Sequence, residues 1–378
     1  MKVVSLRQSS FPVPFRNTFK HASARRGRAE NVIVIAQSES GQVGVGEGCP
    51  RDYVTGETTT TAQAFLDRHM PSVTREIGDL ESLRRWIDAH EREIDRNPAA
   101  FCALELALLE LFAKDRGESL EALLELPALS GTCRYTAVLG DSPAPVYWLQ
   151  LRRYWSSGFR DYKVKLSGDL RRDRWKLKRL RARGEAARIR LDANNLWQEP
   201  RDCIAHLNSL SAGFFAVEEP LAQNDIAGCA RVSEALGVKI VLDESFLRAD
   251  QLDAISNEPE RWILNCRVSK LGGLVRSLRV ARAAAERGLG IIIGAQVGET
   301  SILTRAGLAL GQGVVGSPIA REGAFGTYLL KRDLTPQPLQ FGVGGILSPD
   351  CLLDVDAPGF GFPIRKAVME AFAPAGRA

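Results

Sequence analysis

The chain has 378 residues, of which 45% are hydrophobic and 25% are charged. These fractions are ordinary for a globular protein, so they exclude a disordered chain, a collagen-like repeat and a long coiled coil. The net charge of +5 (50 basic minus 45 acidic residues) is small for this length, and the two basic clusters contain a single aromatic residue, Trp175, so we expect no nucleic-acid partner.

The first part of the sequence predicts an α+β module. Residues 31–36 form a β-branched run, and residues 43–48 return after a turn at 38–42, as in a hairpin. The glycines of the returning run lack the third glycine and the following helix of a dinucleotide-binding loop. From about residue 58 to 114 the pattern is helical, and residues 101–112 are the strongest helix former.

The seven cysteines indicate a reduced protein without a zinc site. Their number is odd and no two lie within ten residues of each other, so they form no CxxC motif. The first seven residues contain no uninterrupted apolar segment, and residues 306–320 are too short and too polar to span a membrane. We therefore expect a cytoplasmic protein with no membrane partner.

From about residue 133, short β-rich segments recur about every 25 residues, each followed by a helical stretch or loop. Seven or eight such units in series predict a parallel (β/α)8-type barrel rather than an open sheet. The polar, basic stretch 167–184 suits the outer ring of helices, with a solvated face. The predicted strands are 134–138, 161–166, 188–193, 213–218, 238–243, 262–266 and 289–294.

Charged residues stand where the predicted strands end. In a barrel of this type the active site is built at the carboxyl ends of the strands. Lys163 and Lys165 point to the same side of one strand, and the next three strands end at Asp192, Glu218 and Asp243. Three convergent carboxylates cannot all stay ionised without a cation, and oxygen ligands suit Mg²⁺, with Mn²⁺ as the alternative.

A lysine pair beside such a metal indicates proton abstraction α to a carboxylate. Repulsion between two ammonium groups favours a neutral amine on one of them, and an amine accepts a proton. A cation on the substrate carboxylate stabilises the enediolate that forms when the α-proton leaves. The sequence therefore predicts an enzyme that acts on a small carboxylate substrate.

The ordered motifs resemble the enolase superfamily, and more closely its muconate-lactonizing-enzyme subgroup, over nearly the whole chain. The resemblance implies an α/β fold, a modified (β/α)7β barrel with an α+β capping domain, divided into residues 1–130, 131–333 and a segment 334–378 that returns to the capping domain. It also implies a homo-oligomer. The motifs are YKVKL at 162–166, LDAN at 191–194, VEEPL at 217–221, LDES at 242–245 and KLGGL at 270–274.

The resemblance also implies roles for residues of this chain. Asp192, Glu218 and Asp243 would hold Mg²⁺, Lys165 would be the base, and Lys163 its electrostatic partner. Capping loops around 19–26 and 50–55 would contact the distal part of the substrate. The further candidates for contact with substrate or ligands are His21, Tyr53, Thr136, Asn194, Asn265, Gln296 and Glu322.

One position departs from the subgroup. Its members usually carry a second catalytic lysine five residues before the Gly-Gly pair, where this chain has Arg267; Lys270 stands three residues further on. An arginine is essentially never deprotonated, so it cannot be a second base. It can clamp a carboxylate, or it can serve only as a salt-bridge partner of Asp243 or Glu244.

One-base chemistry by Lys165 therefore predicts syn elimination or cycloisomerisation, as in a lyase or isomerase resembling o-succinylbenzoate synthase or muconate cycloisomerase. The first alternative is a racemase or epimerase of N-acylamino acids or dipeptides. The dipeptide version lacks support, because residues 318–325 contain no Asp-x-Asp pair to hold an ammonium group. The second alternative is a barrel that binds a carboxylate without turnover.

Overall fold

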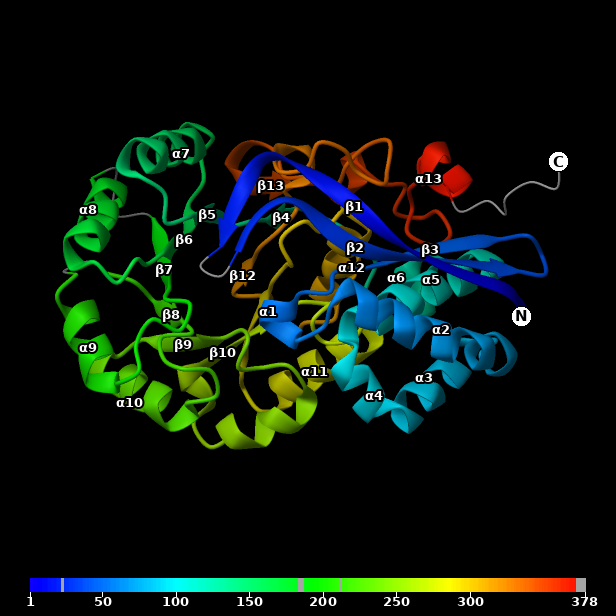
Figure 1. Cartoon of the computed structure of the whole chain (residues 1–378), viewed down its shortest axis with the longest axis horizontal. Coiled ribbons are helices and arrows are strands. Elements are labelled where there is room, and N and C mark those ends of the chain that lie inside the picture. The colour runs from blue at the N-terminus through cyan, green and yellow to red at the C-terminus, as the bar shows by residue number, and fades with distance from the viewer. Residues whose placement is uncertain (22–23, 183–186, 211–212, 372–378) are drawn as a thin grey trace.

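The computed structural model describes residues 1–21, 24–182, 187–210 and 213–371; for 17–21 and 24–26 it describes only the path of the backbone. The described residues form a three-stranded antiparallel sheet with its helices, followed by an eight-stranded parallel sheet surrounded by helices (Figure 1).

The N-terminal sheet is built on one buried helix. Its strands, in spatial order, are β1 (Val3–His21), β2 (Ala24–Ser38) and β3 (Val43–Gly48). Helix α5 (Pro98–Arg116) packs on β2 and β3 and is buried from Pro98 to Ala113. A helix that is apolar on all sides is stable only in a core, and the hydrophobic run predicted as a helix at 101–112 is this core helix.

Glycines on β3 allow the strand to lie directly against α5. A Cβ atom on Gly46 would lie 2.0 Å from the carbonyl oxygen of Ala103, and one on Gly48 would lie 1.9 Å from that of Ala99. No side chain fits at either distance, so only glycine permits this approach. The glycines of residues 43–48, which do not form a dinucleotide-binding loop, therefore serve the packing of β3 on α5.

Shorter helices complete the N-terminal part, and two of them begin at capping boxes. The Thr58 hydroxyl accepts a hydrogen bond from the Thr61 N–H, and the Asp79 carboxylate accepts one from the Ser82 N–H. Such caps satisfy backbone donors that the first helical turn leaves free. These helices are α1 (Asp52–Thr55), α2 (Thr59–Glu76), α3 (Leu80–Ala89), α4 (Glu91–Arg96) and α6 (Leu120–Leu123).

The parallel sheet follows the order of the sequence, so that each strand pairs with the next along the chain. A hydrogen bond of 2.8 Å from the Thr136 N–H to the Arg321 carbonyl joins the first strand region to the last. The strands are β5 (Ala137–Leu139), β6 (Asp161–Lys165), β7 (Arg188–Asp192), β8 (Ala216–Glu218), β9 (Lys239–Leu242), β10 (Trp262–Cys266), β11 (Gly290–Ile293) and β12 (Ala320–Arg321).

Helices connect successive strands around the outside of the sheet. After β9 the connection is two 3-10 helices, η1 (Ala249–Ile255) and η2 (Pro259–Arg261). The predicted modified (β/α)7β barrel with an α+β module is confirmed. The other connecting helices are α7 (Ala144–Ser156), α8 (Leu170–Arg181), α9 (Pro200–Asn208), α10 (Ile226–Leu236), α11 (Leu274–Glu286) and α12 (Ser301–Gln312).

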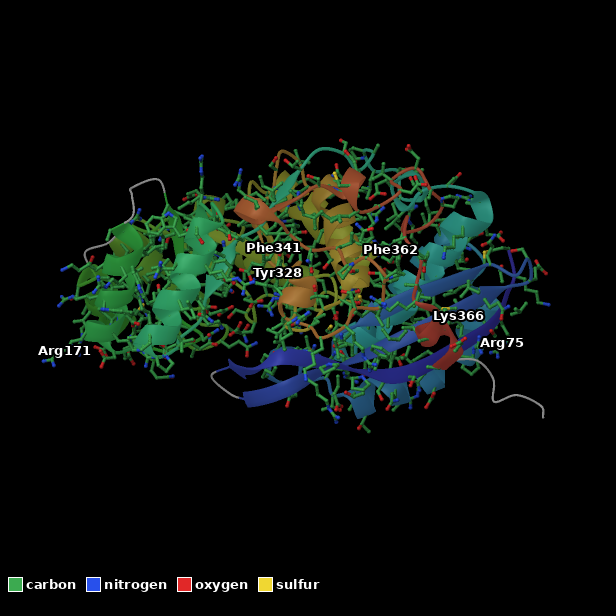
Figure 2. All side chains as sticks on the ribbon, turned by 90° about the horizontal axis from the view of Figure 1, so that it is seen from above. Arg75, Arg171, Tyr328, Phe341, Phe362 and Lys366 are labelled. Atoms are coloured by element: carbon green, nitrogen blue, oxygen red, sulfur yellow. The ribbon has the colours of Figure 1, made fainter. Side chains whose placement is uncertain are left out.

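Helix α8 is the basic helix that the sequence predicts over 167–184. It buries Leu177 and Leu180 against the barrel, while Arg171 is exposed and lies at the outer edge of the molecule (Figure 2). Most of its basic side chains therefore lie at the surface, as expected for the outer ring, whereas Asp173 and Lys176 are buried.

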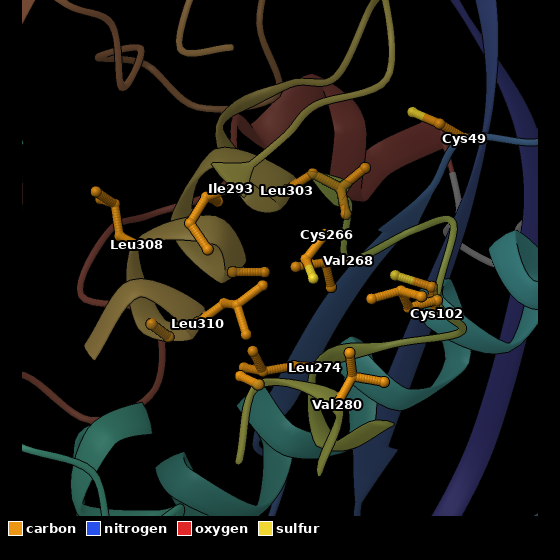
Figure 3. Close-up of a cluster of buried hydrophobic side chains, with 14 of the residues drawn as sticks. Cys49, Cys102, Cys266, Val268, Leu274, Val280, Ile293, Leu303, Leu308 and Leu310 are labelled. Carbon is orange, nitrogen blue, oxygen red and sulfur yellow. The ribbon is translucent and has the colours of Figure 1, made fainter. Parts of the chain in front are cut away.

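The two parts of the molecule share one apolar core and two helix caps. Figure 3 shows Cys49 and Cys102 of the N-terminal part near Val268 and Leu274 of the barrel, and all four belong to one buried cluster. The carboxylate of Glu105, on α5, accepts hydrogen bonds from the Leu274 and Val275 N–H groups at the start of α11. Such contacts fix the position of the N-terminal part on the barrel.

Glu47, on β3, caps a second barrel helix in the same way. Its Oε2 accepts a hydrogen bond of 2.7 Å from the Thr300 hydroxyl and one of 3.3 Å from the Leu303 N–H, at the start of α12. These donors face a carboxylate that lies far away in the sequence, so the cap forms only when both parts are folded.

The C-terminal segment returns to both parts. Strand β13 (Ile346–Leu347) pairs antiparallel with β4 (Cys133–Arg134), and the Leu120 N–H donates to the Gly359 carbonyl at 3.1 Å. The predicted boundaries at 130 and 333 stay a prediction. The remaining elements are η3 (Gly326–Tyr328), η4 (Val343–Gly345), η5 (Pro349–Cys351) and α13 (Lys366–Ala371).

Six of the seven cysteines are buried as free thiols, and Cys351 is exposed. None of the helices in the described part of the chain has both the length and the apolar character needed to cross a bilayer.

Candidate active site

A cavity of about 1050 Å³ opens at the carboxyl ends of the barrel strands. It is lined by the charged residues at the ends of β6 and β7 and by residues that follow β9, β10, β11 and β12. Tyr53 and Val54 of α1, from the N-terminal part, also line it. The structure therefore places the carboxyl ends of these strands around one cavity, as the sequence predicts.

Lys163 and Lys165 both face this cavity from β6. The Nζ atom of Lys165 donates a hydrogen bond of 2.8 Å to Oδ1 of Asn194 and lies 3.4 Å from Oδ2 of Asp192. The side chain of Lys165 is 19% exposed and that of Lys163 only 4%, so Lys165 is the amine of the pair that a substrate can reach.

Lys163 is surrounded by carboxylates. Its Nζ lies 2.8 Å from Oε1 of Glu218, 3.2 Å from Oδ2 of Asp192 and 3.2 Å from Oε1 of Glu322. Burial alone would lower the pKa of Lys163, but these three carboxylates outweigh burial and raise it above its usual value. Lys163 is therefore a fixed positive charge.

The three predicted metal ligands come from neighbouring strands. Lys165, Asp192 and Glu218 are successive partners in the parallel register, and Asp243 follows the end of β9. All three carboxylates are buried. Burial opposes their ionisation, but lysine and arginine side chains lower the pKa of Asp192 and of Asp243 to about 2.

Glu218 is less well compensated. Burial, which its contact with Lys163 only partly offsets, raises the pKa of Glu218 to about 8. Its Oε1 accepts hydrogen bonds from Lys163 and Asn265, whereas its buried Oε2 has no hydrogen-bond partner. An unpartnered buried carboxylate oxygen is costly and marks a place for a cation.

The donor set fits Mg²⁺. The ion prefers carboxylate oxygens, and three carboxylates from adjacent strands provide them. In the described part of the chain no three acidic, imidazole or thiol groups already form a ligand cage. Cationic side chains lie between the carboxylates: Lys163 joins Asp192 to Glu218, and Arg267 contacts Asp243.

Arg267, and not Lys270, faces the cavity. The Arg267 guanidinium bonds to Oδ2 of Asp243 and donates a hydrogen bond of 3.0 Å to Oε1 of Gln296. Lys270 is fully buried beneath the cavity, with its Nζ 3.0 Å from Oδ1 of Asp243 and 2.7 Å from the Asn265 carbonyl. Arg267 thus both lines the cavity and pairs with Asp243.

Sequence reasoning missed a buried network beneath the lysines. Arg190 bonds to Glu322 and lies 3.2 Å from Oδ1 of Asp161. The sequence could have predicted that Arg190 points into the barrel, because Arg190 stands two residues before Asp192 and so lies on the same face of β7.

The structure corrects one site prediction. Thr136 precedes β5, so it lies at the amino end of that strand and away from the cavity, because the strand begins only at Ala137. Its hydroxyl donates a hydrogen bond of 2.8 Å to Asp161, the first residue of β6, at the closed end of the barrel.

Most of the other candidates are placed at the cavity. Tyr53, Asn194, Gln296 and Glu322 line it. Asn265 lies behind Glu218, to which it donates a hydrogen bond of 3.2 Å. Residues 22 and 23 of the predicted contact loop 19–26 lie outside the described residues, and for His21 and the rest of this loop the structure describes only the backbone, at the ends of β1 and β2.

A second, apolar half of the cavity was not predicted at all. It is formed by α7, by the segment after β12 and by the C-terminal segment, none of which carries a charged motif. Its residues include Val138, Val146, Tyr154, Phe325, Tyr328, Phe341 and Val343.

Comparisons with known proteins agree with this architecture. A family model described as "Enolase C-terminal domain-like" matches residues 148–368. Among curated relatives, the L-Lys-D/L-Arg epimerase of Methylococcus capsulatus is 28% identical over 374 residues, covering 95% of this chain and 97% of its own length.

Two solved structures have the same fold. A dipeptide epimerase from Enterococcus faecalis V583, complexed with Mg and the dipeptide L-Leu-L-Tyr, is 23% identical with a TM-score of 0.81, covering 96% of this chain and 99% of its own. A muconate lactonizing enzyme from Pseudomonas fluorescens, complexed with muconolactone, is 21% identical with a TM-score of 0.85, covering 98% and 99%.

Proposed function

Because the chain belongs to the enolase C-terminal domain-like family, we propose that it removes the α-proton of a carboxylate substrate, with Lys165 as the base and Mg²⁺ as the cofactor. The observation that carries this proposal is the position of the Lys165 amine. It lies in the cavity, 3.4 Å from Asp192, the first of three carboxylates on adjacent strands. A base and a cation site then face the same substrate carbon and carboxylate.

Asp192, Glu218 and Asp243 are the residues that would hold the ion. A bound Mg²⁺ would stabilise the negative charge that develops on the substrate carboxylate as its α-proton leaves. Lys163 adds a fixed positive charge next to Asp192 and Glu218. Asn194 holds the Lys165 amine through its Oδ1 and so sets the direction from which the proton is taken.

The fate of the deprotonated substrate depends on the opposite side of the cavity. We assign that side to Arg267. Its carboxylate neighbours outweigh burial and raise its pKa above the usual value, so it does not act as a base. One-base chemistry, with return of the proton to the same face or syn elimination, follows from this residue.

Epimerisation is the second candidate function, and the relatives favour it. They include an epimerase of L-Lys-D/L-Arg and a dipeptide epimerase solved with Mg and a dipeptide, rather than eliminating enzymes. Epimerisation needs proton delivery to the face opposite Lys165, and Arg267 offers no neutral amine there. The two candidates share the first step and differ only in the stereochemistry of the product.

The test is incubation of the Mg²⁺-loaded protein with dipeptides and N-acylamino acids in D₂O, followed by proton NMR and chiral chromatography. We expect deuterium at the α-carbon with retained configuration, or an alkene product where a leaving group is present. Lys165→Ala should lower the exchange rate about 100- to 10,000-fold. Lys178→Ala, an exposed lysine of α8, is the matched control.

Two results would contradict parts of the proposal. Exchange with inversion in the unmodified protein would replace the one-base reading by epimerisation. Binding of acids without any exchange would indicate a carboxylate-binding barrel that lacks turnover and would overturn the proposed function.

A further inference from the structure

Part of the wall of this cavity consists of apolar side chains, and we call this part the apolar lobe. It is continuous with the charged half, since both belong to the same cavity. The lobe is defined by Val146 and Tyr154 of α7, by Phe325 and Tyr328 after β12, and by Phe341 and Val343 of the C-terminal segment.

Phe341 is the centre of the lobe. Its ring stacks on that of Tyr328 at 5.3 Å between centroids and meets the rings of Phe325 and Phe159 edge-on at 5.3 and 5.4 Å. Figure 2 shows Tyr328 and Phe341 next to each other near the middle of the molecule. Edge-on and stacked contacts hold these rings in fixed orientations, so the wall is preformed.

The outer edge of the lobe exposes apolar surface. Val146 is 46% exposed, Tyr328 43% and Val343 80%. These are large apolar side chains that line the same cavity, although they come from three separate stretches of the chain. Exposed apolar groups gathered at a cavity mouth are typical of a binding surface for an apolar ligand group.

Charged groups near the lobe are already engaged. Asp141, which also lines the cavity, lies 2.7 Å from Nζ of Lys176 and 3.0 Å from Arg172. The Arg153 guanidinium lies over the Tyr328 ring, 5.5 Å from its centroid. A substrate group with its own positive charge therefore finds no uncompensated partner in Asp141, whereas an uncharged ring meets the apolar and aromatic side chains of the lobe.

We propose that the apolar lobe binds the part of the substrate distal to its reacting carboxylate, and that this part is an uncharged apolar group, with an aromatic ring as the best fit. The inference rests on the proposed function, because it places the reacting carbon beside Lys165. It assigns the specificity of the enzyme to α7 and the C-terminal segment rather than to the capping loops alone.

The first test compares two probes that differ only in the distal group: N-acetyl-alanine and N-phenylacetyl-alanine. Dissociation constants are measured by calorimetry with the full-length Mg²⁺-loaded protein. We expect the phenyl probe to bind at least tenfold more tightly, because the lobe removes its ring from water. Equal affinity, or failure of both probes to bind, would overturn the inference.

Matched variants locate the effect. Val146→Asp and Val343→Asp place a charge on exposed positions of the lobe, where folding is not at risk, and should reduce the preference for the phenyl probe to below threefold. Leu149→Asp is the control, because Leu149 lies on the same helix, is 69% exposed and does not line the cavity. An unchanged preference in both lobe variants would refute the assignment.

Deuterium exchange separates this inference from the proposed function. Tighter binding of the phenyl probe without exchange at its α-carbon supports the lobe and contradicts the proton abstraction. Exchange of both probes at similar kcat/KM, with equal affinity, supports the proton abstraction and contradicts the lobe.

Discussion

Lys270 donates a hydrogen bond of 3.0 Å from its buried Nζ to Oδ1 of Asp243, while Arg267 holds the other oxygen of the same carboxylate. The two cations have different surroundings. Lys270 also donates to two backbone carbonyls and is closed off from the cavity, whereas Arg267 faces it. Of these two cations, Arg267 is therefore the one that can present a group to a substrate in the cavity.

Arg267→Lys should change the stereochemistry of the reaction. An amine at this position can lose its proton, so the variant has a base on each face of the substrate. We expect α-deuterated product of inverted configuration to appear in D₂O, detected by chiral chromatography. Arg282→Lys, an exposed position on α11, should leave the product configuration as it is. Retention alone in the Arg267→Lys protein would contradict the assignment of this face.

Glu218→Gln should weaken metal binding. The amide keeps the shape of the side chain. It cannot carry a negative charge, and its NH₂ group replaces one carboxylate oxygen; in Glu218 the Oε2 atom has no protein partner. We expect the dissociation constant for Mg²⁺, measured by calorimetry, to rise at least tenfold. Glu234→Gln, which is exposed on α10, is the control for the loss of one acidic residue. Equal affinity in both variants would remove Glu218 from the ligand set.

The stability of the protein should fall as the pH rises, in part through Glu105. Burial raises its pKa to about 8, although two backbone N–H groups of α11 favour its ionised form. Its ordinary value is 4.5, so the native state holds a proton that the unfolded chain releases between about pH 4.5 and 8. Over this window the contribution of Glu105 to the free energy of unfolding decreases.

Urea unfolding of the wild type and of Glu105→Gln at pH 5.5 and 8.0 measures this effect. The glutamine is neutral throughout, so the decrease should be smaller in the variant. A decrease of the same size in both proteins would show that Glu105 does not titrate in this range.

Gly46→Ala should destabilise the N-terminal part. The added methyl group would lie 2.0 Å from the Ala103 carbonyl oxygen, so β3 and α5 must move apart. Overpacking of this kind costs about 1–3 kcal/mol of unfolding free energy, measured by urea denaturation. Gly27→Ala, where a Cβ meets no atom within 4 Å, should unfold at an unchanged urea concentration.

The fold could be predicted because each barrel unit repeats the same local pattern. The β-branched run within 289–294 and the charged end at Asp192 are visible without any contact information. Strand length was less predictable: β8 begins only at Ala216, whereas the sequence favours a start at 213, because pairing with neighbours rather than local composition decides where a strand begins.

The apolar lobe could not be predicted for a different reason. Its walls come from residues as far apart in the chain as Val146 and Val343, and each segment alone looks like an ordinary amphipathic helix or loop. The cap from Glu105 to α11 is similar, since an acidic residue inside a hydrophobic helix gives no sign of its partner. Long-range pairing of this kind becomes visible only in the folded chain.

The sequence resemblance named the family correctly, and the comparisons then favour its epimerases over the cycloisomerases that Arg267 suggested.

The division of the cavity between strand ends and peripheral segments has an evolutionary consequence. Helix α7 and the residues around Val343 carry none of the acid–base groups, so they can accumulate substitutions without disturbing the β6–β9 strand ends. Substitutions in these outer segments would therefore change which carboxylate substrate is bound, while the residues that remove the α-proton stay the same.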